Sequence, residues 1–403
     1  MQIRPILSAL SRNKTGAILI ALQIALTMTI IVNSVFMIQD RRGQMDRASG
    51  IDEANTFIYS YSGFAEDFNE KTQIPEDLNY IRQLPGVVDA VQTNSAPLTG
   101  GGWSMGLATE QGADADGVGT AIYFVDSHGL DAFGVNLLAG RNFTPDEVIW
   151  RERSETKWPG QGIITKELAS DMFDGDWQAA LGKTVFIAET HPINIVGIVE
   201  KMQAPWNGWN GIERTLLFPS QLLFGSGRVM VRTEPGERDR LMREVEEGLV
   251  ANYDGRLIRR VQSMEEIREN SYRNHNGMNT ILTTLIVCLT VITALGIVGL
   301  ASFSVNRRKK QIGTRRALGA RKIDIMRYFM LENFLITSFG VIVGAGMTIG
   351  LNMLLVNALD LPKLDWYYVP AGMVVLWLIG QLAVYGPAKK ACQISPALAT
   401  RSV

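Results

Sequence analysis

The sequence predicts an α-helical membrane protein with four transmembrane helices and a large α+β extracytoplasmic domain inserted between helices 1 and 2. Four segments have no charged residue over at least 23 positions: 16–38, 277–305, 333–359 and 366–388. At 1.5 Å per helical residue, each can cross a hydrocarbon core of about 30 Å. Residues 39–276 have the mixed charges and turn residues of a water-soluble domain, and residues 306–332 are strongly basic.

The first apolar segment is predicted to stay in the membrane as an anchor. Its apolar run is 23 residues long, and the charged sequence Gln39-Asp40-Arg41-Arg42 follows it. A cleavable signal peptide would have a shorter apolar run and small residues at this point. The 1–15 segment that precedes it is expected to be a cytoplasmic, amphipathic amino terminus.

The distribution of basic residues predicts the orientation. Segment 306–332 carries nine Lys or Arg against Asp324 and Glu332, and short basic loops remain on the cytoplasmic side of a membrane. Basic residues also precede the first span and occur in the 389–403 tail, so both termini are predicted to be cytoplasmic. The short, net-negative 360–365 loop and the 39–276 domain then lie outside.

The spans themselves have the composition of structural helices. None contains Asp, Glu, Lys, Arg or His, whereas transporters driven by protons or sodium usually keep such groups within the bilayer. Small residues at helical spacing allow close helix packing, although glycine is also simply frequent in membrane helices. The candidates are Gly340, Gly344, Gly346 and Gly350 in the third span, with Ala21, Ala25 and Thr29 in the first.

The 39–276 domain alternates strand-type and helix-type patterns. Short apolar runs predict strands at 56–61, 86–93, 120–125, 184–187, 193–199, 215–218 and 229–232. Helical patterns occur at 76–83, 166–173 and 237–252. Both cysteines lie in or beside the spans, so this domain is predicted to be a cysteine-free α+β domain. We expect two subdomains, with a break near Arg214.

The basic segment also contains the pattern Gln-Ile-Gly-x-Arg-Arg-Ala-Leu-Gly-Ala at 311–320. This pattern resembles the cytoplasmic coupling segment of MacB/FtsX-type ABC permeases, through which a separate ATPase drives the membrane protein. The alternative is a basic loop that touches lipid headgroups. Apolar residues within the basic stretch, and a glycine suited to end a helix, favour a short helix received by a partner. The resemblance implies ATPase coupling by Ile312, Gly313, Arg315, Arg316, Ala317, Leu318, Gly319 and Ala320.

The resemblance extends over the rest of the chain. Residues 125–144, 164–169, 181–184 and 196–198 are similar to successive blocks of the MacB-type periplasmic core domain. In that family a porter-like part, split in sequence, surrounds an inserted, mainly β part. By similarity, the porter-like part would be about 45–130 and 215–270, and the inserted part about 135–212.

The resemblance implies a non-catalytic permease that transmits ATP-driven motion for efflux of periplasmic substrate, in the inner membrane of a diderm bacterium. ATP and Mg²⁺ would bind to a separate ATPase, with no cofactor or metal on this chain. Other implied partners are a second permease copy or a paralogous permease, a periplasmic adaptor with an outer-membrane duct, and membrane lipids, without nucleic acid. Lipoprotein extraction and control of a cell-wall hydrolase remain alternatives within the superfamily.

Two loops are candidates for contact with a partner or substrate. Residues 102–106 match the G-x-S-x-G pattern of hydrolases, but glycines precede Ser104 where a strand is required. We therefore interpret Trp103 and Ser104 as part of a flexible loop, and keep a membrane-anchored hydrolase, like a ligand sensor, as an alternative class. Trp206 and Trp209 lie among turn residues, where ring packing and an exposed contact surface are both open.

Overall fold

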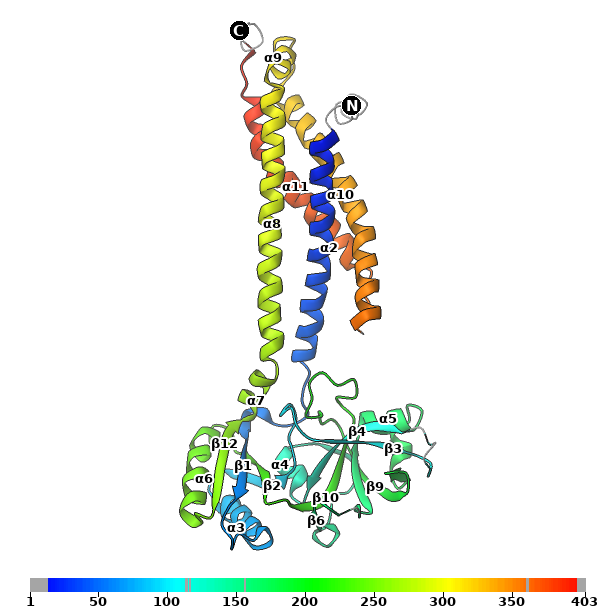
Figure 1. The fold of residues 1–403 in the computed structure, drawn as a ribbon, viewed down its shortest axis with the longest axis vertical. Helices are drawn as coiled ribbons and strands as arrows, with labels where there is room; N and C mark the ends of the chain where they lie inside the picture. The colour runs from blue at the N-terminus through cyan, green and yellow to red at the C-terminus, as the bar shows by residue number, and fades with distance from the viewer. Residues whose placement is uncertain (1–13, 113–114, 116, 156, 360–361, 397–403) are drawn as a thin grey trace. The chain divides into compact units, whose positions relative to one another are not determined.

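The computed structural model describes residues 14–112, 115, 117–155, 157–359 and 362–396 (Figure 1). The predicted segments 1–15, 360–365 and 389–403 therefore lie partly outside the described residues. The chain divides into two compact units. One, here called the core domain, is Asp46–Asn274, and the other, the helical unit, contains the residues up to Met45 and from His275 onward.

The helical unit contains α2 (Lys14–Met45), α8 (Arg273–Arg307), α9 (Lys309–Ala317), α10 (Lys322–Leu359) and α11 (Tyr368–Cys392). All of these except α9 are long and apolar enough to cross a membrane. α10 begins eleven residues before the predicted third span, so much of segment 306–332 is helical. An acidic residue in the first turn favours this start, and the Asp324 carboxylate accepts a hydrogen bond from the Arg321 N–H at 3.0 Å.

Small residues form a close contact between α2 and α10. A Cβ atom built on Gly340 would lie 2.9 Å from the Ala21 carbonyl oxygen, and one on Gly344 would lie 3.0 Å from the Ala25 Cα. The predicted spacing of small residues in the two spans therefore corresponds to one packed seam. Gly346 and Gly350 take no part in it, because nothing lies within 4 Å of a Cβ at either position.

Valine substitutions should separate these two classes of glycine. Gly340→Val places a branched side chain against backbone atoms of α2, and overpacking of this kind costs about 1–3 kcal/mol. Gly346→Val, the matched control, adds the same atoms to open space. We expect a lower midpoint of SDS-induced unfolding for Gly340→Val only. Equal midpoints for the two variants would contradict the seam.

The core domain begins with a four-stranded antiparallel sheet of order β12-β1-β11-β2. Its strands are β1 (Thr56–Gly63), β2 (Val87–Thr93), β11 (Ser226–Thr233) and β12 (Arg256–Ser263). Alternate residues of β1, namely Phe57, Tyr59 and Tyr61, share a core with α3 (Glu70–Gln83) and α6 (Arg238–Asn252). The two helices therefore pack on one face of this sheet.

The second sheet has eight strands, in the order β4-β3-β8-β9-β7-β10-β6 with β5 on β9. An additional pairing of β10 with β4 closes the first six into a ring. Its interior is apolar and includes Leu107, Ile122 and Phe124. The strands are β3 (Trp103–Ala108), β4 (Val118–Val125), β5 (Leu137–Gly140), β6 (Ile149–Glu152), β7 (Gln161–Thr165), β8 (Thr184–Ile187), β9 (His191–Val199) and β10 (Thr215–Leu223).

Short elements complete the core domain. They are η1 (Glu53–Asn55), α4 (Gly129–Phe133), η2 (Pro145–Glu147), α5 (Lys166–Met172), η3 (Trp177–Ala180) and α7 (Met264–Ser271).

The boundary between the two sheets differs from the predicted division at about 130 and 215. β3 and β4, assigned to the porter-like part, belong to the eight-stranded sheet, as does β10. The chain passes between the sheets after β2 and again between β10 and β11. The predicted break at Arg214 is wrong because the Arg214 carbonyl accepts a hydrogen bond from the Ala121 N–H at 2.9 Å, inside the second sheet.

Candidate coupling site

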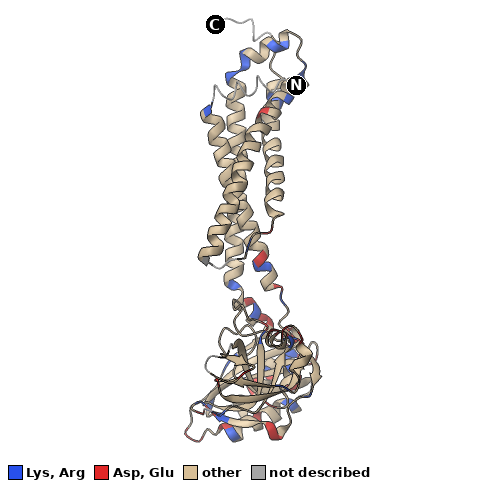
Figure 2. Ribbon diagram, turned by 90° about the vertical axis from the view of Figure 1, so that its right-hand side faces the viewer, with Lys and Arg blue, Asp and Glu red and all other residues tan. Residues whose placement is uncertain are grey.

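α9 forms a corner that connects two long helices. α8 ends at Arg307, and the next residue has φ −104° and ψ 13°, which turns the chain into α9. α9 ends at Ala317, and Gly319 follows with φ +93°. Glycine adopts this left-handed conformation without the steric cost of a side chain. The predicted short helix closed by glycine is present, and Lys and Arg gather at this end of the helical unit (Figure 2).

Three residues of the predicted coupling set are buried or half-buried within the helical unit. Ile312 is 4% exposed and packs in an apolar cluster with residues of α8, α10 and α11, and Gly313 is buried as well. Ala320 is half-buried against the same cluster. Ile312 and Gly313 are thus buried within this chain, and their predicted contact with an ATPase stays a prediction. Their apolar contacts anchor the corner to the ends of the long helices.

Arg316 is also occupied within the chain. Its Nη1 donates a hydrogen bond to the carbonyl oxygen of Cys392 at 2.6 Å, at the end of α11. The last carbonyls of a helix have no partner within the helix, and a cation there is favourable. Arg316 thus caps α11, and its predicted contact with an ATPase stays a prediction.

Arg315 and Arg308 both contact Tyr328 in α10. The Arg315 guanidinium is 5.1 Å from the centre of the Tyr328 ring, in cation–π geometry. Arg308 donates to the Tyr328 hydroxyl at 3.1 Å and to the Glu332 carboxylate at 3.0 Å. These contacts hold the first turns of α10 against the start of α9. Arg315 remains exposed, so it can also meet a partner.

The exposed residues at the carboxyl end of the corner are Thr314, Arg315, Ala317, Leu318 and Gly319, here called the α9 tip. Leu318 is 84% exposed and is not part of the apolar cluster around Ile312. Exposed apolar residues flanked by cations are typical of sites that receive a partner. Apart from Thr314, the α9 tip is therefore the exposed portion of the predicted coupling set.

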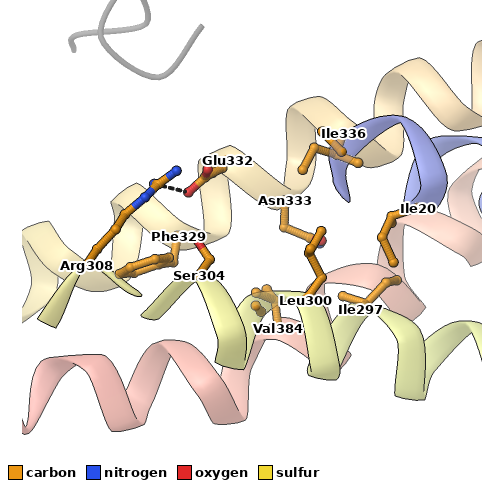
Figure 3. A pocket seen from close by; sticks show the side chains of 12 residues that line it. Ile20, Ile297, Leu300, Ser304, Arg308, Phe329, Glu332, Asn333, Ile336 and Val384 are labelled. Carbon is orange, nitrogen blue, oxygen red and sulfur yellow. Dashed lines mark hydrogen bonds and ion pairs between the residues drawn. The ribbon is translucent and has the colours of Figure 1, made fainter. Parts of the chain in front are cut away.

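The four long helices line a narrow cavity next to Arg308, the residue that precedes α9 (Figure 3). Ile20, Leu300 and Val384 line its apolar end, and the Arg308–Glu332 ion pair lies at the other end. The cavity brings together residues of α2, α8, α10 and α11. The same helices also share an apolar core, which includes Ile24, Met28 and Val341.

The core domain corrects the interpretation of Trp103 and Ser104. They belong to strand β3 and not to a flexible loop, and Ser104 pairs with Ala121 of β4. Ser104 therefore lacks the strand–turn–helix setting of a hydrolase nucleophile. The Trp103 ring packs edge-on against Phe124 at 5.3 Å and stacks on Phe224 at 6.0 Å. Trp103 is thus largely part of the packing of the second sheet.

Trp206 and Trp209 pack mainly against each other and their own loop. Their ring centres are 5.9 Å apart in an edge-to-face arrangement. Both pack on a small cluster of Ala121, Ala204 and Ile212. Of the two alternatives for this loop, the structure shows ring packing, in which each ring is half-buried.

The two segments by which the core domain joins the membrane helices are linked to each other. Arg268 of α7, just before α8, donates two hydrogen bonds of 2.6 Å to the Glu53 carboxylate in η1, which follows α2. Arg268 also donates to the Arg47 carbonyl at 3.0 Å. The hydrogen bonds to Glu53 raise the pKa of Arg268. Sequence analysis missed this pair because its partners are 215 residues apart.

Comparison with known proteins relates these features to a family. A MacB-like periplasmic core domain matches residues 16–247, and an FtsX-like permease C-terminal domain matches residues 283–396. The ABC transporter permease YknZ of Bacillus subtilis is 24% identical over 344 residues, which cover 82% of this chain and 80% of YknZ.

Other relatives are longer proteins. The macrolide export ATP-binding/permease protein MacB of Escherichia coli is 26% identical over 345 residues, covering 82% of this chain and 49% of MacB. That of Wolinella succinogenes is 24% identical, with 83% and 50% covered. The chain thus spans about half the length of these MacB relatives. The crystal structure of the periplasmic region of MacB from Actinobacillus actinomycetemcomitans has 15% identity and a TM-score of 0.34, covering 57% of this chain and 97% of that region.

The core-domain match covers more than half of the chain, and the permease match contains α9 and the cluster that anchors it. The chain therefore belongs to the MacB/FtsX family of ABC transporter permeases.

Proposed function

We propose that this chain is the permease subunit through which a separate ATPase drives export of a substrate held outside the membrane. The observation that carries the proposal is the α9 tip, where Leu318 is 84% exposed while Ile312 of the same corner is 4% exposed. A rigidly anchored corner with a free apolar end can transmit the movement of a bound partner. ATP and Mg²⁺ would be bound by that partner, and this chain would be non-catalytic.

The proposal includes how movement reaches the core domain. An ATPase that displaces the α9 tip would shift α8 and α10. The Glu53–Arg268 ion pair would make the two segments at the core domain move together. A second permease, identical or paralogous, would complete the transporter, and an adaptor with an outer-membrane duct would receive the substrate.

Breaking the Glu53–Arg268 pair tests this coupling. We expect Glu53→Ala to reduce export at least about fivefold while the ATPase still hydrolyses ATP, because the two connections lose their bidentate link. The matched control is Glu244→Ala, which breaks an exposed ion pair with Arg240 on α6; such pairs contribute about 0–1 kcal/mol. Exchanging the charges (Glu53→Arg with Arg268→Glu) should restore part of the export.

Both activities would be measured in proteoliposomes that contain the permease and its ATPase. If Glu53→Ala exports at the wild-type rate, transmission through this pair is wrong. If it stops ATP hydrolysis as well, the pair supports the fold rather than the transmission of movement.

The orientation that the proposal requires is also testable. In a variant with Cys288 and Cys392 replaced, single cysteines would be introduced at Thr109 of the core domain and Thr314 of the α9 tip, both exposed. The basic 306–332 segment stays in the cytoplasm, which places the core domain on the other side of the membrane. We therefore expect an impermeant thiol reagent added to intact cells to label position 109. Position 314 should react only after the membrane is opened. Labelling of position 314 in intact cells would refute the orientation.

A further inference from the structure

The core domain contains a basic cleft between its two sheets. The cleft opens to solvent and has a volume of about 610 Å³. Four arginines line it and no acidic residue does, within the described part of the chain: Arg153, Arg228, Arg259 and Arg260. A neighbouring hollow shares Arg228 and Arg260 and likewise lacks an acid. Cations gathered around one concave surface attract anions to it.

Strand register explains why two of these arginines converge. Arg228 of β11 and Arg259 of β12 are both paired with Ser60 of β1, from opposite sides. Residues directly opposite each other in a sheet present their side chains on the same face. With neighbouring strands about 4.8 Å apart, the two arginines begin about 10 Å apart on either side of a serine. This is a span that one ligand can bridge.

A β-bulge adds the third arginine. The register between β1 and β12 shifts between Ile58 and Ser60, so that β12 has one extra residue there. Arg260 lies in this bulge with φ +51°, a left-handed conformation that non-glycine residues rarely adopt. In a regular strand, Arg259 and Arg260 would point to opposite faces, whereas here both line the cleft. The bulge thus directs an additional positive charge into the cleft at the expense of backbone strain.

None of the four arginines forms an ion pair among the described residues. Arg228 donates only to the Asn94 carbonyl oxygen, at 2.6 Å, and its pKa is lowered, first by burial and then by the positive charge of Arg260. The nearby carboxylate of Glu70 accepts hydrogen bonds from the Tyr61 hydroxyl at 3.0 Å and the Gly225 N–H at 2.7 Å, and does not line the cleft. Arg228 is half-buried, whereas Arg153, Arg259 and Arg260 are exposed. Like charges gathered without counterions repel one another, and a bound anion would offset that repulsion.

The opposite wall of the cleft is aromatic and apolar. Trp103, Leu222 and Phe224 of the second sheet's side line it, and the Arg153 guanidinium lies 5.4 Å from the centre of the Phe224 ring. We propose that this cleft binds a molecule that combines an apolar or aromatic body with phosphate or carboxylate groups. The identification of this molecule as the exported substrate rests on the proposed function. Its binding in the cleft does not depend on the proposed function.

The test is direct binding to the full chain in nanodiscs of zwitterionic lipid, without ATPase or ATP. The probe is 4-methylumbelliferyl phosphate, compared with coumarin-3-carboxylate and with uncharged 4-methylcoumarin. We expect submillimolar binding of at least one acid, at least tenfold tighter than that of the uncharged ring, and the tighter acid identifies the preferred group. No binding of either acid at millimolar concentration, or equal binding of all three compounds, would overturn the proposal.

Variants locate the binding. Arg259→Gln with Arg260→Gly should weaken binding of the acid at least tenfold, and the glycine relieves the strained backbone, so the protein should fold. The matched control Arg243→Gln removes an exposed arginine of α6 outside the cleft and should bind within twofold of wild type. Equal losses in both variants, or none in the double variant, would overturn the assignment to this cleft.

A second variant leaves every arginine in place. Ser60→Glu puts a carboxylate between Arg228 and Arg259, where it should act as a built-in ligand. Binding of the probe should fall at least tenfold while the unfolding temperature stays the same or rises. Unchanged probe binding by a folded Ser60→Glu protein would contradict the site. Because the assay contains no ATPase, its failure would leave the coupling proposal standing.

Discussion

Replacing Leu318 with aspartate should detach this permease from its ATPase. Burial of a leucine side chain stabilises a contact by about 1.5–3 kcal/mol, which corresponds to roughly a 10- to 100-fold change in affinity. An unpaired carboxylate in the same contact costs more. Leu318 is 84% exposed, so the change should leave the permease folded. Ala317→Asp should act in the same direction. Co-purification of the ATPase and its permease-dependent ATP hydrolysis would measure the loss.

The control for this prediction is Lys310→Glu. Lys310 is also exposed on α9 but lies outside the tip, and this substitution changes the charge of the segment by more than Leu318→Asp does. If the basic segment only contacts lipid headgroups, Lys310→Glu should have the larger effect. If Leu318→Asp binds its ATPase and works like wild type, the α9 tip is not the coupling surface.

Sequence patterns were sufficient for the spans and for the existence of α9, because long uncharged runs and a glycine-closed basic helix are local signals. They were insufficient to separate the two faces of α9. Ile312 and Leu318 are both apolar residues of one basic segment, yet one is anchored and the other is free. The difference depends on α11, whose end contributes Ala388, Ala391 and Cys392 to the cluster around Ile312.

The core domain shows the same division between local and distant information. Apolar runs such as 56–61 and 193–199 predicted β1 and β9, whereas β3 and β12 were missed. Glycines precede β3, and β12 carries three arginines, both of which obscure the strand pattern. The bulge at Arg260 arises only from the pairing of β12 with β1. The basic cleft therefore could not be predicted from the sequence, because the convergence of its arginines depends on this strand pairing.

A buried ion pair beside the four-stranded sheet of the core domain is the other site of large expected effect. Asp77 of α3 pairs with Arg256 at the start of β12, and their side chains are 4% and 0% exposed. Gln73 donates to the Asp77 carboxylate at 3.1 Å, and Arg256 donates to the Leu249 carbonyl of α6 at 3.1 Å. The pair thus joins both helices that cover the four-stranded sheet to its edge strand.

Asp77→Asn should destabilise the four-stranded sheet and its two helices by about 3–5 kcal/mol, because it leaves the Arg256 charge buried without a counterion. Hydrogen exchange of the full chain should show amides of α3 and β12 losing roughly two to four orders of magnitude of protection. The helical unit serves as the internal reference. The double variant Asp77→Leu with Arg256→Met should regain most of the protection, since an apolar pair of similar volume often replaces a buried ion pair without loss. Wild-type protection in Asp77→Asn would show that the charge of Asp77 does not stabilise the fold.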